Sequence, residues 1–144
     1  MSSKTYLGFD YGSKRIGVAV GNTVSASATA LDTVRIVNGQ PDWEHISRLI
    51  SEWQPDALVV GWPIQMDGSA NPITAEARRF GNRLHGRYHL EVHHVDERLS
   101  SQMALSEIRE AGYNRRSMEL VDSYAAREIL QTFINGQEGN DEQR

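Results

Sequence analysis

The sequence predicts an α/β fold in which helices cover both faces of a mixed five-stranded sheet, in the order β-β-β-α-β-α-β-α-α. Two observations lead to this class. Extended, glycine-containing runs fill the first part of the chain, whereas from residue 42 apolar residues recur at helical spacing between short apolar runs. The length of 144 residues also suits one domain with one core. We expect that domain to span residues 1–136, and the acidic residues 137–144 to form a disordered tail.

The first two strands are expected to form a hairpin. Residues 6–10 and 15–20 are largely apolar, and the polar connection between them contains Gly12, which suits a tight turn. Residues 31–37 alternate in the manner of a strand and are broken by a turn signal at residues 38–39. This third run is therefore predicted to pair as the outer strand.

Helices and buried strands alternate in the rest of the chain. Apolar residues at positions i, i+3, i+4 and i+7 give the helices, and short uniformly apolar runs give the parallel strands, whose two faces are both covered. The predicted strands are residues 57–60 and 90–95. The predicted helices run from Asp42 to just before Pro55, onward from Pro72, from Ser100 or Ser101 to Ala111, and over residues 117–135, closing at Gly136.

Three consecutive strands followed by βα units, with the first strand central, form the ribonuclease H-like three-layer arrangement. Parallel strands need crossover helices, and the sequence supplies both of them. The actin-like ATPases share this core, but they need a second domain to close over a nucleotide, and the chain has no room for one. A P-loop is excluded because residues 8–14 lack its glycine and lysine spacing and precede a strand.

Composition excludes several other classes. The chain has no cysteine, so it can form neither a disulfide framework nor a thiolate zinc site. It shows no long apolar segment, which predicts a cytoplasmic protein without membrane contact. The formal net charge of -4 does not indicate a protein that coats nucleic acid, so any such contact must come from local basic clusters.

Acidic residues occupy three positions that a folded sheet would bring together. Asp10 lies near the end of the first strand, and Asp96 and Glu97 lie where the last strand ends, which is where open α/β sheets form ligand crevices. Asp122 precedes an inward-facing helical stripe by four residues, so it faces the sheet. Carboxylates placed together repel each other unless a divalent cation compensates their charge, and an all-oxygen set suits Mg²⁺ or Mn²⁺.

Each acid also has a structural interpretation when it is taken alone. Asp10 can bond a turn amide, Asp122 can sit in a first helical turn where the helix dipole favours it, and Glu97 can pair with a surface arginine. His93 and His94 alternate across a strand and lack the spacing of a metal pair, so both are interpreted as structural. Only the convergence of all three acids favours catalysis.

Four blocks of the sequence resemble the successive signatures of the YqgF/RuvX family. They are "GFDYGSKRIGVAV", "VVGWPIQMDGS", "DERLS" and "VDSYAAREILQ", and they span residues 8–131 in order. The resemblance implies a ribonuclease H-like fold related to the RuvC Holliday-junction resolvases. It also implies a metal-dependent phosphodiesterase site in which Asp10, Glu97 and Asp122 are the catalytic residues and the metal ligands. Two ions roughly 3.5–4 Å apart, bridged by Asp10, would then activate water and stabilise the leaving oxygen.

The chain departs from the family pattern in the loop after the fourth predicted strand. Trp62 replaces the usual leucine, Gln65 replaces asparagine, and Asn71 precedes Pro72 where glycine is usual. These changes concern substrate recognition more than chemistry. The neighbouring Asp96 leaves open which residue of the pair is the second carboxylate.

Basic and aromatic residues near the acids are the predicted substrate contacts. Trp62 offers a platform for stacking a base, or else packs beneath its loop, with about equal weight. A stripe of arginines on the helix that begins at Pro72, comprising Arg78, Arg79, Arg83 and Arg87, either clamps phosphates or forms a solvated face. The predicted substrate-binding set is Lys14, Arg15, Trp62, Gln65, Arg98 and Arg116.

The predicted function is that of a metal-dependent nuclease that processes the 5′ end of pre-16S rRNA during ribosome biogenesis. Its partners would be precursor rRNA and pre-ribosomal particles, and the protein would be a monomer or a weak homodimer. Two alternatives stay open: a Holliday junction resolvase acting on branched DNA as a dimer, and a noncatalytic RNA-binding or ribosome-assembly factor.

Overall fold

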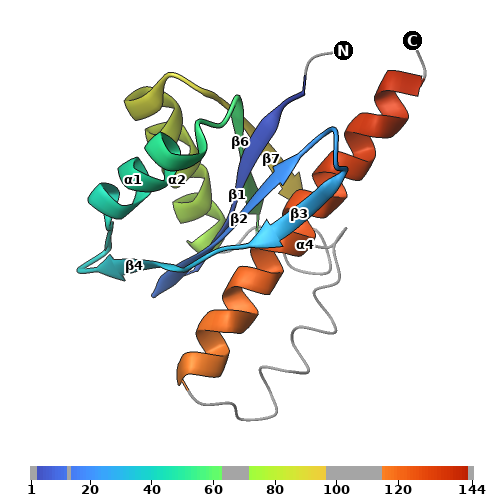
Figure 1. The fold of residues 1–144 in the computed structure, drawn as a ribbon. Helices are drawn as coiled ribbons and strands as arrows, with labels where there is room; N and C mark the ends of the chain where they lie inside the picture. The colour runs from blue at the N-terminus through green and yellow to red at the C-terminus, as the bar shows by residue number, and fades with distance from the viewer. Residues whose placement is uncertain (1–2, 13, 63–71, 97–114, 143–144) are drawn as a thin grey trace.

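The structure is a computed structural model that describes residues 3–12, 14–62, 72–96 and 115–142. Within these ranges a twisted sheet carries two helices on one face and a long helix on the other (Figure 1). The sheet order is β5-β4-β2-β1-β6-β7, and β3 also pairs with β2. The strands are β1 (Thr5–Tyr11), β2 (Arg15–Asn22), β3 (Ser27–Ala30), β4 (Val34–Val37), β5 (Gln40–Pro41), β6 (Ala57–Trp62) and β7 (Glu91–Asp96). The helices are α1 (Trp43–Trp53), α2 (Pro72–Tyr88) and α4 (Arg115–Glu142).

The predicted hairpin and the parallel strands are confirmed, whereas the strand count is not. β1 and β2 pair antiparallel, and β6 and β7 extend the sheet in parallel from β1. In the described ranges the sheet has seven strands instead of the predicted five. The run predicted over residues 31–37 is a strand only from Val34, and a separate strand, β3, precedes it.

The turn at Asn38 and Gly39 explains the additional strand β5. Both residues have positive φ, 54° and 75°, which is the backbone of a two-residue hairpin turn whose twist matches its strands. Val37 therefore pairs with Gln40, and Ile36 pairs with Pro41. The sequence located this turn correctly but not the return of the chain beyond it.

Two apolar cores lie on the two faces of the sheet. Side chains alternate along β1, so that Leu7, Phe9 and Tyr11 pack toward α1 and α2, whereas Tyr6 packs toward α4, where its ring lies 5.1 Å from that of Phe133. Figure 1 shows α4 crossing the face opposite α1 and α2. The sheet is thus buried on both sides, as the three-layer arrangement requires.

Glycines on β1 and β2 allow α4 to lie directly on the strands. A Cβ atom at Gly8 would come within 2.9 Å of Cβ of Leu130. A Cβ at Gly17 would overlap the backbone carbonyl of Asp122. These glycines occupy the α4-facing positions of their strands, so helix and sheet backbones approach more closely than side chains would permit.

The helix starts follow the predicted signals, and one helix end does not. Asp42 caps α1 by accepting a hydrogen bond from the His45 amide at 3.2 Å, and α2 begins at Pro72. α4 begins at Arg115 and continues to Glu142, so the end predicted at Gly136 is wrong. Gly136 is exposed and has open space around it. Its φ is not among the positive values of the described residues, so it does not form the left-handed cap that would end a helix. The helix predicted before Ala111 lies outside the described residues.

None of the helices in the described ranges is both long enough and apolar enough to cross a membrane.

Candidate functional site

The ends of three parallel strands bring acidic positions to one edge of the sheet. Asp10 of β1 pairs in register with Gly61 of β6, and Trp62 pairs with Asp96 of β7. Asp10 and Asp96 therefore stand at the carboxyl ends of strands that run in the same direction. This edge is where open α/β sheets form ligand crevices, as the sequence predicted.

Asp10 and Asp122 meet across Gly17. Asp10 lies on the α4 side of β1, between the inward-packed Phe9 and Tyr11, and its partner on β2 is Gly17. The backbone of Asp122 lies against Gly17 so closely that a Cβ there would overlap it. Two carboxylate residues from opposite ends of the chain thus flank one glycine. This juxtaposition was predicted from the helical stripe, whose members Ala126, Ile129 and Leu130 are fully buried.

Arg15 holds the carboxylate of Asp122. Its Nε donates a hydrogen bond of 2.8 Å to Oδ2, and the two side chains are only 21% and 17% exposed. Arg15 and Gly17 share the α4 side of β2 because strand positions two apart share a face. The sequence assigned Arg15 to substrate and missed this contact. The signal available was that spacing, together with the inward position predicted for Asp122.

The remaining predicted site residues are less fully described. Lys14 is exposed, and its backbone carbonyl accepts a hydrogen bond of 3.0 Å from the Ile36 amide, which ties the turn to β4. Trp62 is the last residue of β6, and Arg116 lies in the first turn of α4. For both residues the structure describes the backbone and not the side chain. Glu97, Gln65 and Arg98 lie outside the described residues.

The donor set fits a hard divalent cation. Asp10 and Asp122 supply carboxylate oxygens, which Mg²⁺ and Mn²⁺ prefer, and a guanidinium already balances one of the two charges. The described part of the chain contains no cluster of three or more histidine, cysteine, aspartate or glutamate side chains suited to a metal. The third carboxylate that the sequence predicts, at residue 97, lies outside this part of the chain.

The two histidines of β7 face opposite sides of the sheet. The ring of His93 lies 4.9 Å from that of Phe133 on α4, whereas His94 lies beside Gly81 of α2. Burial, followed by the nearby Arg78 and His93, lowers the pKa of His94 below 6.5. These contacts show that odd-numbered positions of β7 face α4.

Two of the arginines on α2 stack on an aromatic ring of α1. The guanidinium carbons of Arg83 and Arg87 lie 5.1 Å and 4.1 Å from the ring centroid of Trp43. Arg83 also donates a hydrogen bond of 3.0 Å to Gln40. The predicted arginine stripe therefore packs in part against α1 and β5 and is not simply a solvated face.

Tyr11 borders a pocket on the α2 face that the sequence did not predict. Tyr11 ends β1, directly after Asp10, and belongs to the core on that face. Burial, followed by the carboxylate of Glu76, raises the pKa of the Tyr11 phenol above 10.0. Arg79 and Arg83 oppose this rise.

Comparison with known proteins identifies the family of this chain. The model of the family described as RuvX, Holliday junction resolvase, matches residues 4–136. A relative from Escherichia coli O7:K1 is 47% identical over 133 residues, which cover 92% of this chain and 96% of that protein. A relative from Aeromonas salmonicida is 44% identical and covers 96% and 100% of the two chains. Both relatives carry the name "Putative pre-16S rRNA nuclease".

Solved structures agree on the fold. RuvC of T. thermophilus in complex with a Holliday junction substrate aligns with a TM-score of 0.55 at 16% identity, covering 94% of this chain and 96% of that one. The fowlpox virus Holliday junction resolvase aligns at 0.54 and 14% identity, covering 92% and 99%. The architecture is therefore ribonuclease H-like, and the match over residues 4–136, with relatives above 40% identity, shows that the chain belongs to the RuvX family.

Proposed function

We propose that the protein is a metal-dependent nuclease that hydrolyses phosphodiester bonds. The observation that carries this proposal is the meeting of Asp10 and Asp122 across Gly17 at the edge where β1 ends. Full-length relatives named as nucleases support the same reaction class. Mg²⁺ or Mn²⁺ held at these carboxylates would supply a water of lowered pKa and a stabilised leaving oxygen.

The chain's own residues hold the two carboxylates in place. Asp10 is fixed by β1, which is paired on both sides by β2 and β6. Asp122 is fixed by the contact of α4 with Gly17 and by its ion pair with Arg15. With a cation held at these carboxylates, the guanidinium of Arg15 would be placed to bind a phosphate oxygen of the substrate. Arg15 would then serve both folding and substrate binding.

Glu97 is the third catalytic residue and metal ligand that we propose, because the tract "DERLS" resembles the corresponding signature of the family whose model matches this chain. In the sequence it directly follows β7, which ends at Asp96.

Precursor rRNA is the substrate that we propose, through cleavage at the 5′ end of pre-16S rRNA on pre-ribosomal particles in the cytoplasm. The names of the relatives support this choice. Branched DNA is the second candidate, because the family description names Holliday junction resolvases. Lys14, Arg98 and Arg116 would contact phosphates, and Trp62 and Gln65 would contact bases.

The test compares the protein with its Asp10→Asn variant on labelled precursor rRNA and on a four-way DNA junction, each with Mg²⁺ or Mn²⁺. We expect the wild type to cleave the RNA faster, and we expect Asp10→Asn to lower the rate by about 100-fold or more, as when a group that stabilises transition-state charge is lost. The matched control is Asp32→Asn, which removes an exposed carboxylate and should cleave normally.

Three outcomes would contradict the proposal or its substrate. Retained cleavage in purified Asp10→Asn would remove Asp10 from the chemistry. Preferred cleavage of the junction, together with a dimeric mass in solution, would favour the resolvase. RNA binding that survives Asp10→Asn, with no metal-dependent cleavage by the wild type, would leave a noncatalytic RNA-binding factor.

A further inference from the structure

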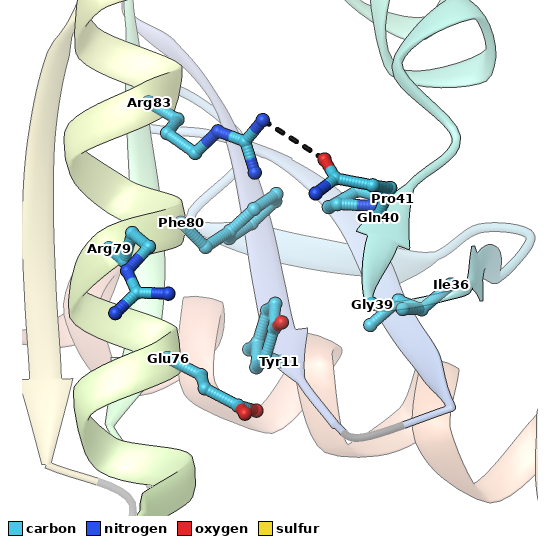
Figure 2. Close-up of a pocket in the computed structure, with 9 residues that line it drawn as sticks. All are labelled: Tyr11, Ile36, Gly39, Gln40, Pro41, Glu76, Arg79, Phe80 and Arg83. Atoms are coloured by element: carbon cyan, nitrogen blue, oxygen red, sulfur yellow. Dashed lines mark hydrogen bonds between the residues drawn. The ribbon is translucent and has the colours of Figure 1, made fainter.

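A pocket opens on the face of the sheet opposite Asp122. It has a volume of about 230 Å³ and lies between α2, the end of β1 and the hairpin of β4 and β5 (Figure 2). Figure 2 shows side chains of α2 along one wall and the hairpin residues along the other. The lining residues are Tyr11, Ile36, Gly39, Gln40, Pro41, Glu76, Arg79, Phe80 and Arg83.

This pocket begins one residue from the carboxylate site. Tyr11 follows Asp10 in β1, so their Cα atoms are about 3.8 Å apart. Successive strand residues face opposite sides, which directs Asp10 toward α4 and Tyr11 into the pocket. The pocket and the Asp10 side chain thus lie on opposite faces of β1, and a nucleic-acid strand that passes around the carboxyl end of β1 would reach both.

The polar groups of the pocket suit an anion. Arg83 is committed to Gln40 and to the Trp43 ring, so its guanidinium is fixed as one side of the opening. Arg79 lies one helical turn before Arg83 on α2, is exposed, and adds a second positive charge to the lining. Figure 2 shows the Arg79 guanidinium and the Glu76 carboxylate on the α2 side of the Tyr11 ring. Two arginines against one glutamate leave the lining with net positive charge.

The rest of the lining is apolar or aromatic, and the space is small. The rings of Tyr11 and Phe80 are 5.2 Å apart, and Ile36 and Pro41 close the opposite wall. The volume lies below the roughly 300 Å³ at which pockets for drug-sized ligands begin. A space of this size suits one base with its phosphate held at the exposed Arg79, but not a duplex.

We propose that this pocket is a subsite for one unpaired nucleotide adjacent to the phosphodiester that is cut, with its phosphate on Arg79 and its base against the apolar wall. The inference rests on the proposed nuclease function and extends it, because it makes the substrate single-stranded beside the cut. Phosphate contacts set the register of a strand without reading its sequence, so the pocket would position the strand over Asp10.

The test measures binding apart from cleavage. A fluorescein-labelled eight-nucleotide single-stranded RNA and a duplex of the same sequence are titrated with protein in EDTA, and the fluorescence anisotropy is followed at several salt concentrations. We expect Arg79→Gln to weaken single-strand binding by about 5-fold or more and to lower the salt slope by about one, as for the loss of one phosphate contact. Arg79→Lys should recover part of the affinity.

The matched control is Arg48→Gln, which removes the same charge from an exposed position on α1. Equal binding of the RNA by Arg79→Gln and Arg48→Gln would overturn the inference, and so would an equal loss for the single strand and the duplex. A wild type that binds RNA but cleaves none would refute the nuclease function instead. The binding comparison would still decide whether the subsite exists.

Discussion

Arg15 forms an ion pair with the largely buried carboxylate of Asp122, and its side chain thereby loses conformational freedom. Its Nε lies 2.8 Å from Oδ2 of Asp122, and both side chains are mostly buried, so each charge is partly removed from water and is balanced in part by the other. Removing one partner leaves the other charge poorly solvated. The pair is therefore expected to couple folding to the state of the proposed site.

A double-mutant cycle on this pair gives the first prediction at the residue scale. We expect Arg15→Gln and Asp122→Asn each to lower the free energy of unfolding, and the double variant to lower it by less than their sum, with a coupling of about 1 kcal/mol. Urea denaturation of the four proteins measures the coupling. Arg48→Gln, which removes an exposed arginine from α1, is the control and should not couple to Asp122→Asn. Strictly additive losses would show that the pair contributes no stability.

The sequence predicted the two acids of the site but not their cationic partner. Asp122 was located by the apolar stripe of its own helix, which is local information. The contact with Arg15 depends on which strand residue lies beneath α4, and that is set by the packing of segments far apart in the chain. A prediction from local spacing therefore finds the inward position of Asp122 and misses its ion pair with Arg15, whose assignment to substrate stays a prediction.

At the scale of elements, α4 and the sheet form the contact on which the proposed site depends. Gly17 has no side chain, and this allows the backbone of α4 to reach the strand at Asp122. The same close approach occurs at Gly21, where a Cβ would come within 2.6 Å of Cδ1 of Ile134. Gly17 and Gly21 therefore both allow α4 to pack closely against β2.

Alanine at Gly17 should move α4 away from the sheet. Its Cβ would meet backbone, which cannot swing aside as a side chain can, so we expect a loss of at least about 1–3 kcal/mol in the free energy of unfolding. Cleavage should fall as well, because Asp122 shifts relative to Asp10.

Gly86→Ala is the matched control, since this glycine lies in α2 with open space around it. It should raise the free energy of unfolding by up to about 1 kcal/mol, through the higher helix propensity of alanine. Denaturation curves of both variants decide the point. A Gly17→Ala protein as stable as the wild type would mean that the helix does not rest on the strand.

The elements themselves were predictable to the extent that local signals define them. Asp42 and Pro72 mark helix starts correctly because capping and φ restriction act within a few residues. β5 was missed because it has only two residues and pairs through a turn, which leaves no period to detect. The end of α4 was missed because Gly136 stays helical where nothing crowds it.

At the scale of the whole molecule, the proposed metal site joins the first strand to the last helix. Asp10 precedes the helices that the structure describes, and Asp122 lies on α4, the last of these. Between them the strand order must place β2 beside β1 with Gly17 opposite Asp10. The sequence predicted that β2 lies beside β1, from the hairpin signal between these strands, but not the register that places Gly17 opposite Asp10. A cation bound there would cross-link segments that only the folded chain brings together.

Divalent cations should therefore stabilise the fold independently of catalysis. A ligand that binds only the folded state adds about 2.7 kcal/mol to the free energy of unfolding at 100 times its dissociation constant. We expect Mn²⁺ to raise the thermal midpoint of the wild type and of the Asp32→Asn control, and EDTA to reverse the rise. Asp10→Asn should lose most of this response, while its metal-free midpoint equals or exceeds that of the wild type, because repulsion between the carboxylates is relieved. Calorimetric scans of the three proteins with and without Mn²⁺ measure both effects. An equal Mn²⁺ response in Asp10→Asn would show that the cation binds elsewhere, and that Asp10 and Asp122 meet for structural reasons alone.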